Sequence, residues 1–126
     1  MRTTVGDDWQ SAQMAGVPGA AGKHMALTGN TVAPAKADTV LTGEFAAAGG
    51  GLIRVLAAYA HTAGSSSYSL SNTFTMNASD GSTATPAKLG IFTALTGGLL
   101  VFESAIPSPP AMVPSDSVAI TETVNY

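Results

Sequence analysis

The feature that most constrains the fold is residues 86–124, where short β-favouring segments alternate with turn-forming ones. Segments 88–94 and 99–104 are rich in apolar, β-branched and aromatic residues, and the Gly97-Gly98 pair between them predicts a hairpin turn. Four prolines, at positions 107, 109, 110 and 114, cannot donate ladder hydrogen bonds, so this part is expected to cross the outside of a sheet. A final segment, 117–124, alternates in the manner of a strand. The run indicates antiparallel β structure.

Strands are also predicted upstream, at residues 23–28, 40–45, 52–61 and 68–76. The clearest is 68–76, where apolar residues alternate with serine and threonine. Segment 52–61 is largely apolar on both faces, which favours a central strand covered on both sides, although its alanines also allow a helix. We expect 52–60 and 68–76 to form a hairpin or an adjacent pair. Residues 77–82 have turn composition.

About six or seven strands at this spacing predict an all-β fold, an antiparallel β-sandwich or a jelly-roll-like barrel. Residues 1–22 contain four glycines, one proline and little periodicity, so they predict an extended N-terminal arm or linker. Residues 23–126 then form a single β domain. Its size is close to the commonest for one domain.

Charged residues make up only 10% of the chain, whereas ordinary soluble domains have about 25%. Mean hydropathy is positive, at +0.26. A lone monomer needs a well-charged exterior, so this composition predicts that much of the surface meets other copies or other proteins. The five basic residues are scattered, which argues against direct nucleic-acid binding. No apolar run reaches the roughly 18 residues of a membrane span, and no signal peptide is evident, so we expect neither membrane insertion nor export by that route.

Histidines and carboxylates provide the few candidate ligands. His24 and His61 are the only histidines, and the chain has no cysteine. A mixed site with Glu44, Glu103 or Glu122 stays open, but we expect structural roles for these residues. Glu103 and Glu122 as a glycosidase pair would need a sugar cleft lined with aromatic residues, which this chain scarcely supplies.

Other chemical motifs are incomplete. Segment 18–24 lacks the first glycine and the closing Ser or Thr of a phosphate-binding loop, and 77–82 lacks the ligand spacing of an EF-hand calcium loop. Asn77-Ala78-Ser79 matches a glycosylation sequon, which without a secretion signal we attribute to chance. No G-x-S-x-G elbow is present. We therefore expect no enzyme activity, no catalytic or metal-binding residues and no cofactor.

Five motifs follow one another in the chain: MALT at 25–28, APAKADTVLTGE at 33–44, GLIR at 51–54, AKLGIF at 87–92 and GGLLVFE at 97–103. Together they resemble a cassette of small tailed-bacteriophage virion proteins, over about residues 23–124. In that family an opening stretch precedes an arginine-bearing strand and a closing hairpin. The resemblance implies a virion structural protein, made in the host cytoplasm and placed on the virion exterior, without catalytic residues.

Within such a virion, one small domain with an arm suits a capsid decoration protein, which binds the head as a homotrimer or another symmetric oligomer. Its partners would be itself and the major capsid protein or another virion protein. We expect the arm to bind the partner, with Trp9, Val5 and Met14 as contacts and Trp9 as anchor. A second interpretation of the arm is that Trp9 folds back onto its own domain. The alternative is a tail-fibre or tail-tip protein that binds a receptor or carbohydrate.

Such a binding module needs exposed aromatic residues. Tyr59, Tyr68, Phe92 and Phe102 fall in strand patterns and are expected in the core, which counts against the alternative.

Overall fold

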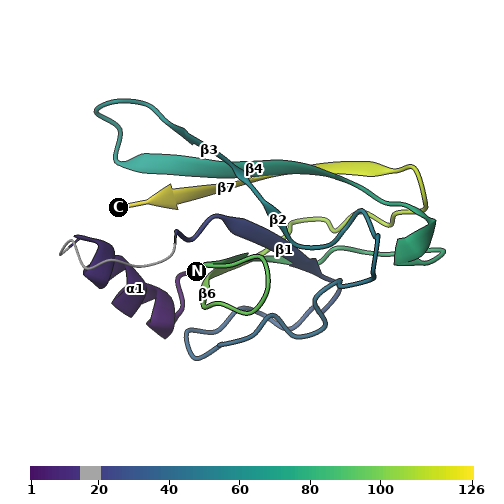
Figure 1. The fold of residues 1–126 in the computed structure, drawn as a ribbon, viewed down its shortest axis with the longest axis horizontal. Coiled ribbons are helices and arrows are strands. Elements are labelled where there is room, and N and C mark those ends of the chain that lie inside the picture. The colour runs from purple at the N-terminus through teal and green to yellow at the C-terminus, as the bar shows by residue number, and fades with distance from the viewer. Residues whose placement is uncertain (15–20) are drawn as a thin grey trace.

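Two antiparallel β-sheets and one N-terminal helix make up the fold (Figure 1). The structure is a computed structural model that describes residues 1–14 and 21–126. The first sheet has the order β2-β1-β5-β6, with β2 (Val55–Leu56), β1 (His24–Thr28), β5 (Lys88–Phe92) and β6 (Leu100–Ala105). The second has the order β3-β4-β7, with β3 (Ala58–His61), β4 (Ser67–Thr75) and β7 (Ser117–Asn125). A helix α1 (Thr4–Met14) and a short 3₁₀ helix η1 (Ala78–Asp80) complete the described elements.

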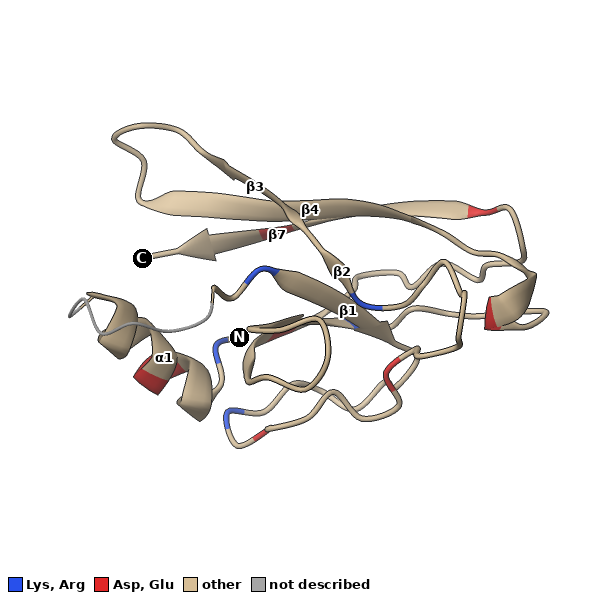
Figure 2. Cartoon of the chain, in the orientation of Figure 1, with Lys and Arg blue, Asp and Glu red and all other residues tan. Residues whose placement is uncertain are grey.

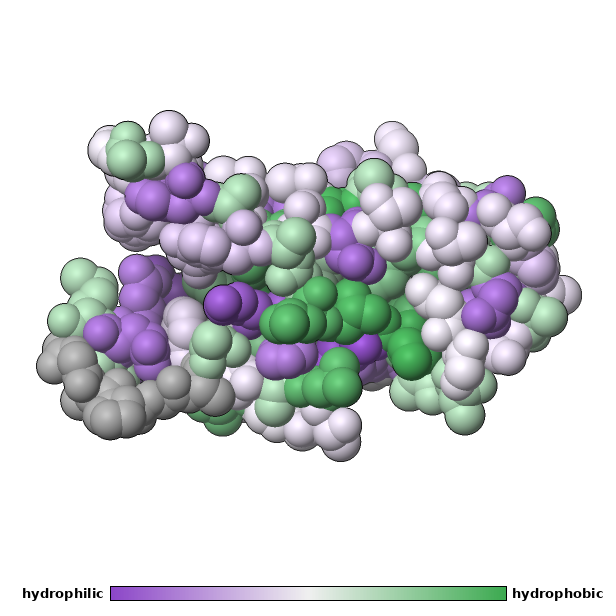
Figure 3. Space-filling view, turned by 45° about the horizontal axis from the view of Figure 1, so that its top comes forward, coloured by the Kyte–Doolittle hydropathy of each residue, from purple (hydrophilic) through white to green (hydrophobic). Residues whose placement is uncertain are grey.

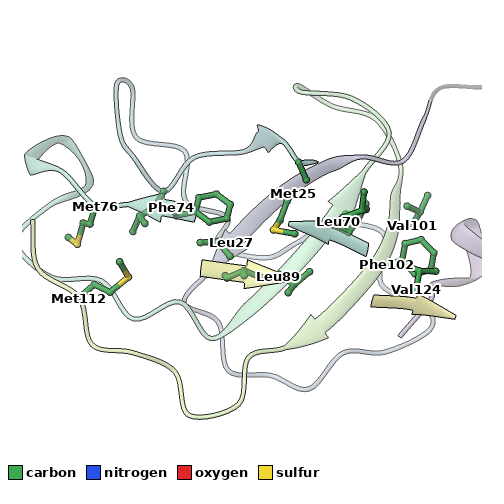
Figure 4. Packing of buried hydrophobic residues seen from close by; sticks show 14 residues of the cluster. Met25, Leu27, Leu70, Phe74, Met76, Leu89, Val101, Phe102, Met112 and Val124 are labelled. Carbon is green, nitrogen blue, oxygen red and sulfur yellow. The ribbon is translucent and has the colours of Figure 1, made fainter. Parts of the chain in front are cut away.

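The prediction of an all-β antiparallel fold is confirmed. Within the described part of the chain the strands form two separate sheets, so the fold is sandwich-like and is not a closed barrel. The two sheets share one main hydrophobic core, because inward-facing residues of both enter the same cluster (Figure 4). Together with buried residues of the connecting segments, the cluster comprises Met25, Leu27, Leu52, Ala57, Leu70, Phe74, Met76, Leu89, Ile91, Val101, Phe102, Met112, Ile120 and Val124. Burying each Leu, Ile or Phe side chain contributes about 1.5–3 kcal/mol.

The pair β4 and β7 carries the clearest alternation in the chain. All nine residues of β4 pair with β7, from Ser67 opposite Asn125 to Thr75 opposite Ser117. Inward-facing Leu70 and Phe74 are buried, and the side chains between them are polar. The predicted strands 68–76 and 117–124 are therefore confirmed within a residue or two.

The hairpin predicted around Gly97-Gly98 is also present, between β5 and β6. Both glycines have positive φ, 66° and 75°, which a residue with a side chain rarely adopts. The proline-rich segment runs along the surface as expected, with one exception. Met112 is buried, and it pairs with Ala84 through two backbone hydrogen bonds of 3.0 and 2.7 Å.

The single central strand predicted at 52–61 is wrong. The chain forms two short strands that belong to different sheets: β2 pairs with β1, and β3 pairs with β4. The crossing point is Ala57, which is buried and donates its N–H to Lys23 O at 2.8 Å. The segment is apolar on both faces because it changes sheets, not because both faces are covered. Leu56 and Tyr59 are in fact exposed.

Segment 40–45, also predicted as a strand, is a loop. Gly43 has φ of 73°, which interrupts an extended conformation, and only Glu44 forms an isolated bridge, to Thr28. Its apolar character has a different origin. Leu41 packs on the outer side of the first sheet against Ala26, Phe92 and Leu100, in a second, smaller buried cluster.

The N-terminal segment differs most from expectation, because residues 4–14 form a helix rather than an extended arm. Thr3 caps α1: its Oγ1 accepts the N–H of Gly6 at 3.0 Å, and its backbone oxygen accepts the N–H of Asp7. The turn before the helix pairs with β6, since Arg2 lies opposite Phe102. Residues 15–20 of the predicted arm lie outside the described residues.

Candidate functional site

The histidines and glutamates considered as metal ligands lie apart, each with its own surroundings. His61 is exposed, and its Nδ1 lies 2.9 Å from Ser67 O, whereas His24 is half-buried in β1. Glu122 accepts the hydroxyl of Ser104 at 2.9 Å. Among residues 1–14 and 21–126, no group of three or more His, Cys, Asp or Glu side chains is placed to hold a metal ion.

In the turn at residues 77–82, the carboxylate of Asp80 binds backbone N–H groups. Asp80 accepts N–H groups from Gly51 at 2.8 Å, Leu52 at 3.2 Å and Asn77 at 2.9 Å. Desolvation raises the pKa of Asp80, but these three donors together outweigh it and hold the pKa below its usual value. The carboxylate fastens the loop before β2 to the loop after β4.

Lys88 and Glu103 form a buried ion pair on the outer side of the first sheet. Lys88 Nζ lies 2.7 Å from Glu103 Oε1, and the two side chains are 5% and 1% exposed. Burial raises the pKa of Glu103, against the lowering effect of Lys88. A hydrogen bond with Glu103 lowers the pKa of Asp38, which lies in the covering loop. The pKa values of the two carboxyls are therefore shifted in opposite directions, that of Glu103 upwards and that of Asp38 downwards.

This charged cluster links three parts of the chain: β5, β6 and the loop that carries Asp38. Asp38 also accepts the backbone N–H of Ala35 at 2.9 Å, which shapes its own turn. Lys88 and Glu103 are enclosed beneath the loop, whereas Asp38 lies in the loop itself and is half-buried. The arrangement braces the loop against the sheet.

A surface of exposed leucines is the strongest candidate for an interaction site. Leu56 at the β2 edge is 63% exposed, and Leu95 and Leu99 in the β5–β6 hairpin are 58% and 48% exposed. Leu95 also borders a hollow of about 450 Å³, whose other lining residues are Glu44, Ala46, Ala47, Ala48, Ile53, Arg54 and Thr96. Figure 3 shows hydrophobic side chains gathered in the middle of one face. We call Leu56, Leu95, Leu99 and the hollow the leucine surface.

Arg54 holds the leucine surface in shape. Its guanidinium binds both carboxylate oxygens of Glu44, at 3.0 and 2.6 Å, and donates to Ala94 O at 3.0 Å and Gly97 O at 2.7 Å. It also lies over the ring of Phe92, 3.6 Å from the centroid. A planar group with five donors is needed for this set of contacts. Arg54 thereby fixes the hairpin turn and the loop at Glu44 relative to each other.

Sequence reasoning missed this surface, although a signal existed. Leu95 and Leu99 flank a glycine turn at the tip of a hairpin, where polar residues are the norm. In the sequence, Arg54 stands out only as the arginine of the GLIR motif. Its role depends on four groups distant in sequence, which no local pattern reveals.

The three residues predicted to contact a partner have different surroundings. Trp9 is half-buried and packs against the main core of its own domain, and Val5 is half-buried too. Gly6 brings α1 close to β6, and Met14 at the end of the helix is exposed. Trp9 is thus part of its own domain, whereas partner binding by Met14 stays a prediction.

Charged residues are sparse along the described chain (Figure 2). The outer face of the second sheet carries none, and its side chains are small: Ala58, Ala60, Ser67, Ser69, Ser71, Thr73, Thr75, Ser117, Ala119, Thr121, Thr123 and Asn125. Among the helices of the described ranges, none combines the length and apolar character needed to span a membrane.

Comparison with known proteins gives no relative. No family model matches the chain, and neither the curated proteins nor the solved structures contain a match.

Proposed function

We propose that the protein is a structural component of a tailed-phage virion, a capsid decoration protein that binds the outer surface of the head as an oligomer. The observation that carries this proposal is the leucine surface, an exposed apolar region on a rigid frame. Large exposed apolar regions are typical of protein–protein contacts. The motif order described above supplies the link to phage virions.

The distribution of charge also supports an assembly role. The chain has five basic and eight acidic residues in 126. Several of these charged side chains form ion pairs within the chain. Lys88 pairs with Glu103, Arg54 with Glu44, and both Arg2 and Lys36 with Asp7. An exterior with so little charge is suited to burial against other proteins.

The leucine surface replaces the free arm as the proposed contact with the shell. Because Trp9 packs on its own domain and Thr3 is fully buried, removing residues 1–22 would damage the β domain itself. Loss of particle binding in that deletion would then be ambiguous. Point substitutions on the leucine surface give a cleaner test.

The first experiment is immunogold labelling of intact particles from a phage that encodes this chain. Gold spread over the head supports decoration, and gold confined to the tail moves the protein to the tail-fibre or tail-tip alternative. Absence of label, with soluble protein in the lysate, overturns the virion proposal.

The second experiment measures binding of purified protein to heads that lack it. Leu95→Ser and Leu99→Ser are expected to weaken binding at least tenfold without unfolding the domain. The matched control is Val113→Ser, since Val113 is as exposed as Leu99, 48% each, and lies in the proline-rich segment. Equal binding by all three variants rules out the leucine surface as the contact.

One observation favours the tail alternative with a carbohydrate-binding role. Tyr59, expected in the core, is exposed, and its ring lies 5.6 Å from that of Tyr68, which lies 6.2 Å from that of Tyr126. Next to Tyr68 is a hollow of about 260 Å³ with polar lining, including His61 and Ser65. Exposed tyrosines beside hydroxyl groups can bind sugars. A glycan array tests this alternative, and Tyr59→Ala should abolish any binding found.

A further inference from the structure

The second sheet ends in a long strand with one free edge. In this sheet β7 is an edge strand of nine residues, and its neighbour is β4; the other edge strand, β3, has four residues. The β6 edge of the first sheet is different, because the N-terminal residues pair with it. Glu103 N donates to Met1 O at 2.8 Å, and Thr3 N donates to Val101 O at 3.1 Å. The described residues thus cover the β6 edge and leave the β7 edge uncovered.

The register shows which backbone groups of β7 are free. Tyr126 N donates to Ser66 O, and Met76 N donates to Asp116 O, so even-numbered residues of this strand are the ones that exchange hydrogen bonds with β4. Such pairs alternate along an antiparallel ladder. The N–H and C=O groups of the odd-numbered residues therefore point away from β4: Ser117, Ala119, Thr121, Thr123 and Asn125.

Four of the common protections of an edge strand are missing from β7. Edge strands are blunted by lysine, proline, bulges or short length. The β7 sequence SVAITETVN contains neither lysine nor proline, and its register with β4 is continuous over nine pairs. Its one charge, Glu122, is on the inward-facing side and is bound to Ser104.

We propose that β7 pairs antiparallel with β7 of a second copy, about a twofold axis at Thr121. In this register Thr121 lies opposite Thr121 of the second copy, Ala119 opposite Thr123, and Ser117 opposite Asn125. Five pairs with free groups on both strands give about ten hydrogen bonds. The result is one continuous six-stranded sheet, with the order β3-β4-β7 in each half.

Two observations favour a second copy as the occupant. A twofold axis needs a self-complementary strand, and β7 meets this need because its free groups repeat symmetrically about Thr121. Glu122 then selects the register. A shift of the axis by one residue would place Glu122 opposite Glu122, whereas the proposed register places it opposite Ile120.

The surroundings of β7 leave its edge accessible. All five residues whose backbone groups point away from β4 are exposed: Ser117, Ala119, Thr121, Thr123 and Asn125. The neutral Ser, Thr and Ala face described above continues across both copies without like charges meeting. The inference stands apart from the virion proposal, since it depends only on β7 and its register.

Analytical ultracentrifugation of the full chain tests the proposal through the backbone. Thr121→Pro removes the outward N–H and keeps every hydrogen bond with β4, and proline is tolerated at this kind of edge position. The wild type and the control Thr121→Val are expected to sediment as dimers, and Thr121→Pro as a folded monomer. A monomeric wild type at 100 µM, or a dimeric Thr121→Pro, overturns the proposal.

A second experiment, based on exchanged charges, distinguishes loss of the dimer contact from unfolding caused by the proline. Ala119→Lys with Thr123→Lys sets lysines opposite each other in the homodimer, and Ala119→Glu with Thr123→Glu does the same with glutamates. Each double variant alone should be monomeric, and an equimolar mixture should form a heterodimer. Homodimers of both double variants, or a mixture that stays monomeric, contradict the register. A wild-type trimer would exclude this twofold contact.

Discussion

Lys88 and Glu103 are the most deeply buried charged side chains of the described residues, and their charged atoms lie 2.7 Å apart. The pair is on the outer side of the first sheet, where the loop carrying Asp38 covers it. A loop of mostly exposed residues is thereby attached to the sheet by charge as well as by Leu41. Because the cluster is desolvated, changes to either partner should be costly.

Lys88→Met is expected to destabilise the protein by about 3 kcal/mol at pH 7, because it leaves the Glu103 carboxylate buried without a cation. Replacing both partners, as in Lys88→Met with Glu103→Leu, should recover most of this loss, since apolar pairs of similar volume are often neutral. Urea unfolding measures both. The control Lys23→Met, at an exposed position, should change stability by less than about 0.5 kcal/mol. An equally mild effect of Lys88→Met would contradict the buried pair.

The pKa shifts of Glu103 and Asp38 predict that their contributions to stability depend on pH in opposite directions. Burial raises the pKa of Glu103 above its ordinary value of 4.5, so its contribution is complete below that pH and is lost as pH rises through the folded-state pKa. The stability of wild type relative to Glu103→Gln should therefore fall as pH rises from about 4.5 towards 7.

The contribution of Asp38 to stability is expected to depend on pH in the opposite direction. Its pKa is lowered from 3.8, first by the hydrogen bond with Glu103, so its contribution is present above pH 3.8 and is lost as pH falls through the folded-state pKa. The advantage of wild type over Asp38→Asn should shrink in acid. Urea titrations at a series of pH values measure both differences, and parallel profiles for the two variants would contradict the opposite pKa shifts.

Strands with one buried face could be predicted from the sequence. In β4, Leu70 and Phe74 alternate with serines and threonines, and the same alternation runs through β7. A pattern of period two needs only the strand itself, because one face meets the core and the other meets solvent. The hairpin at Gly97 and Gly98 was likewise readable, since the turn requires positive φ at both residues.

Elements defined by distant partners could not be predicted. The apolar segment 52–61 changes sheets at Ala57, and nothing local distinguishes such a crossing from a buried central strand. Segment 4–14 becomes a helix because Thr3 caps it and Gly6 fits against Val101, which is almost the whole chain away. The candidate leucine surface was hidden for the same reason, as Arg54 assembles it from three separate segments.

Arg54→Lys is expected to destabilise the protein by about 2 kcal/mol, because an ammonium cannot keep the paired contacts with Glu44, the two carbonyls and the Phe92 ring together. Thermal unfolding followed by circular dichroism gives the magnitude. The hairpin turn should also loosen, which faster amide exchange at Thr96 and Gly97 would reveal. Unchanged exchange there, despite lower stability, would mean that Arg54 does not hold the leucine surface.

Gly6→Ala tests whether α1 belongs to the β domain. A Cβ at Gly6 would lie 2.1 Å from the backbone oxygen of Val101, so the helix has to move away from β6, although alanine is the better helix former. Trp9 is the only tryptophan, and it packs against the core, so its fluorescence reports this contact directly.

The expected result for Gly6→Ala is a red-shifted Trp9 emission and a loss of about 1–3 kcal/mol in stability. Gly29→Ala is the matched control, because its Cβ would lie 3.4 Å from Thr85 O, an ordinary contact, and the emission should not change. If Gly6→Ala keeps the wild-type emission and stability, α1 is not docked and Trp9 is available to a partner. A red shift instead assigns Trp9 to the interior and leaves the leucine surface as the contact to test on the phage head.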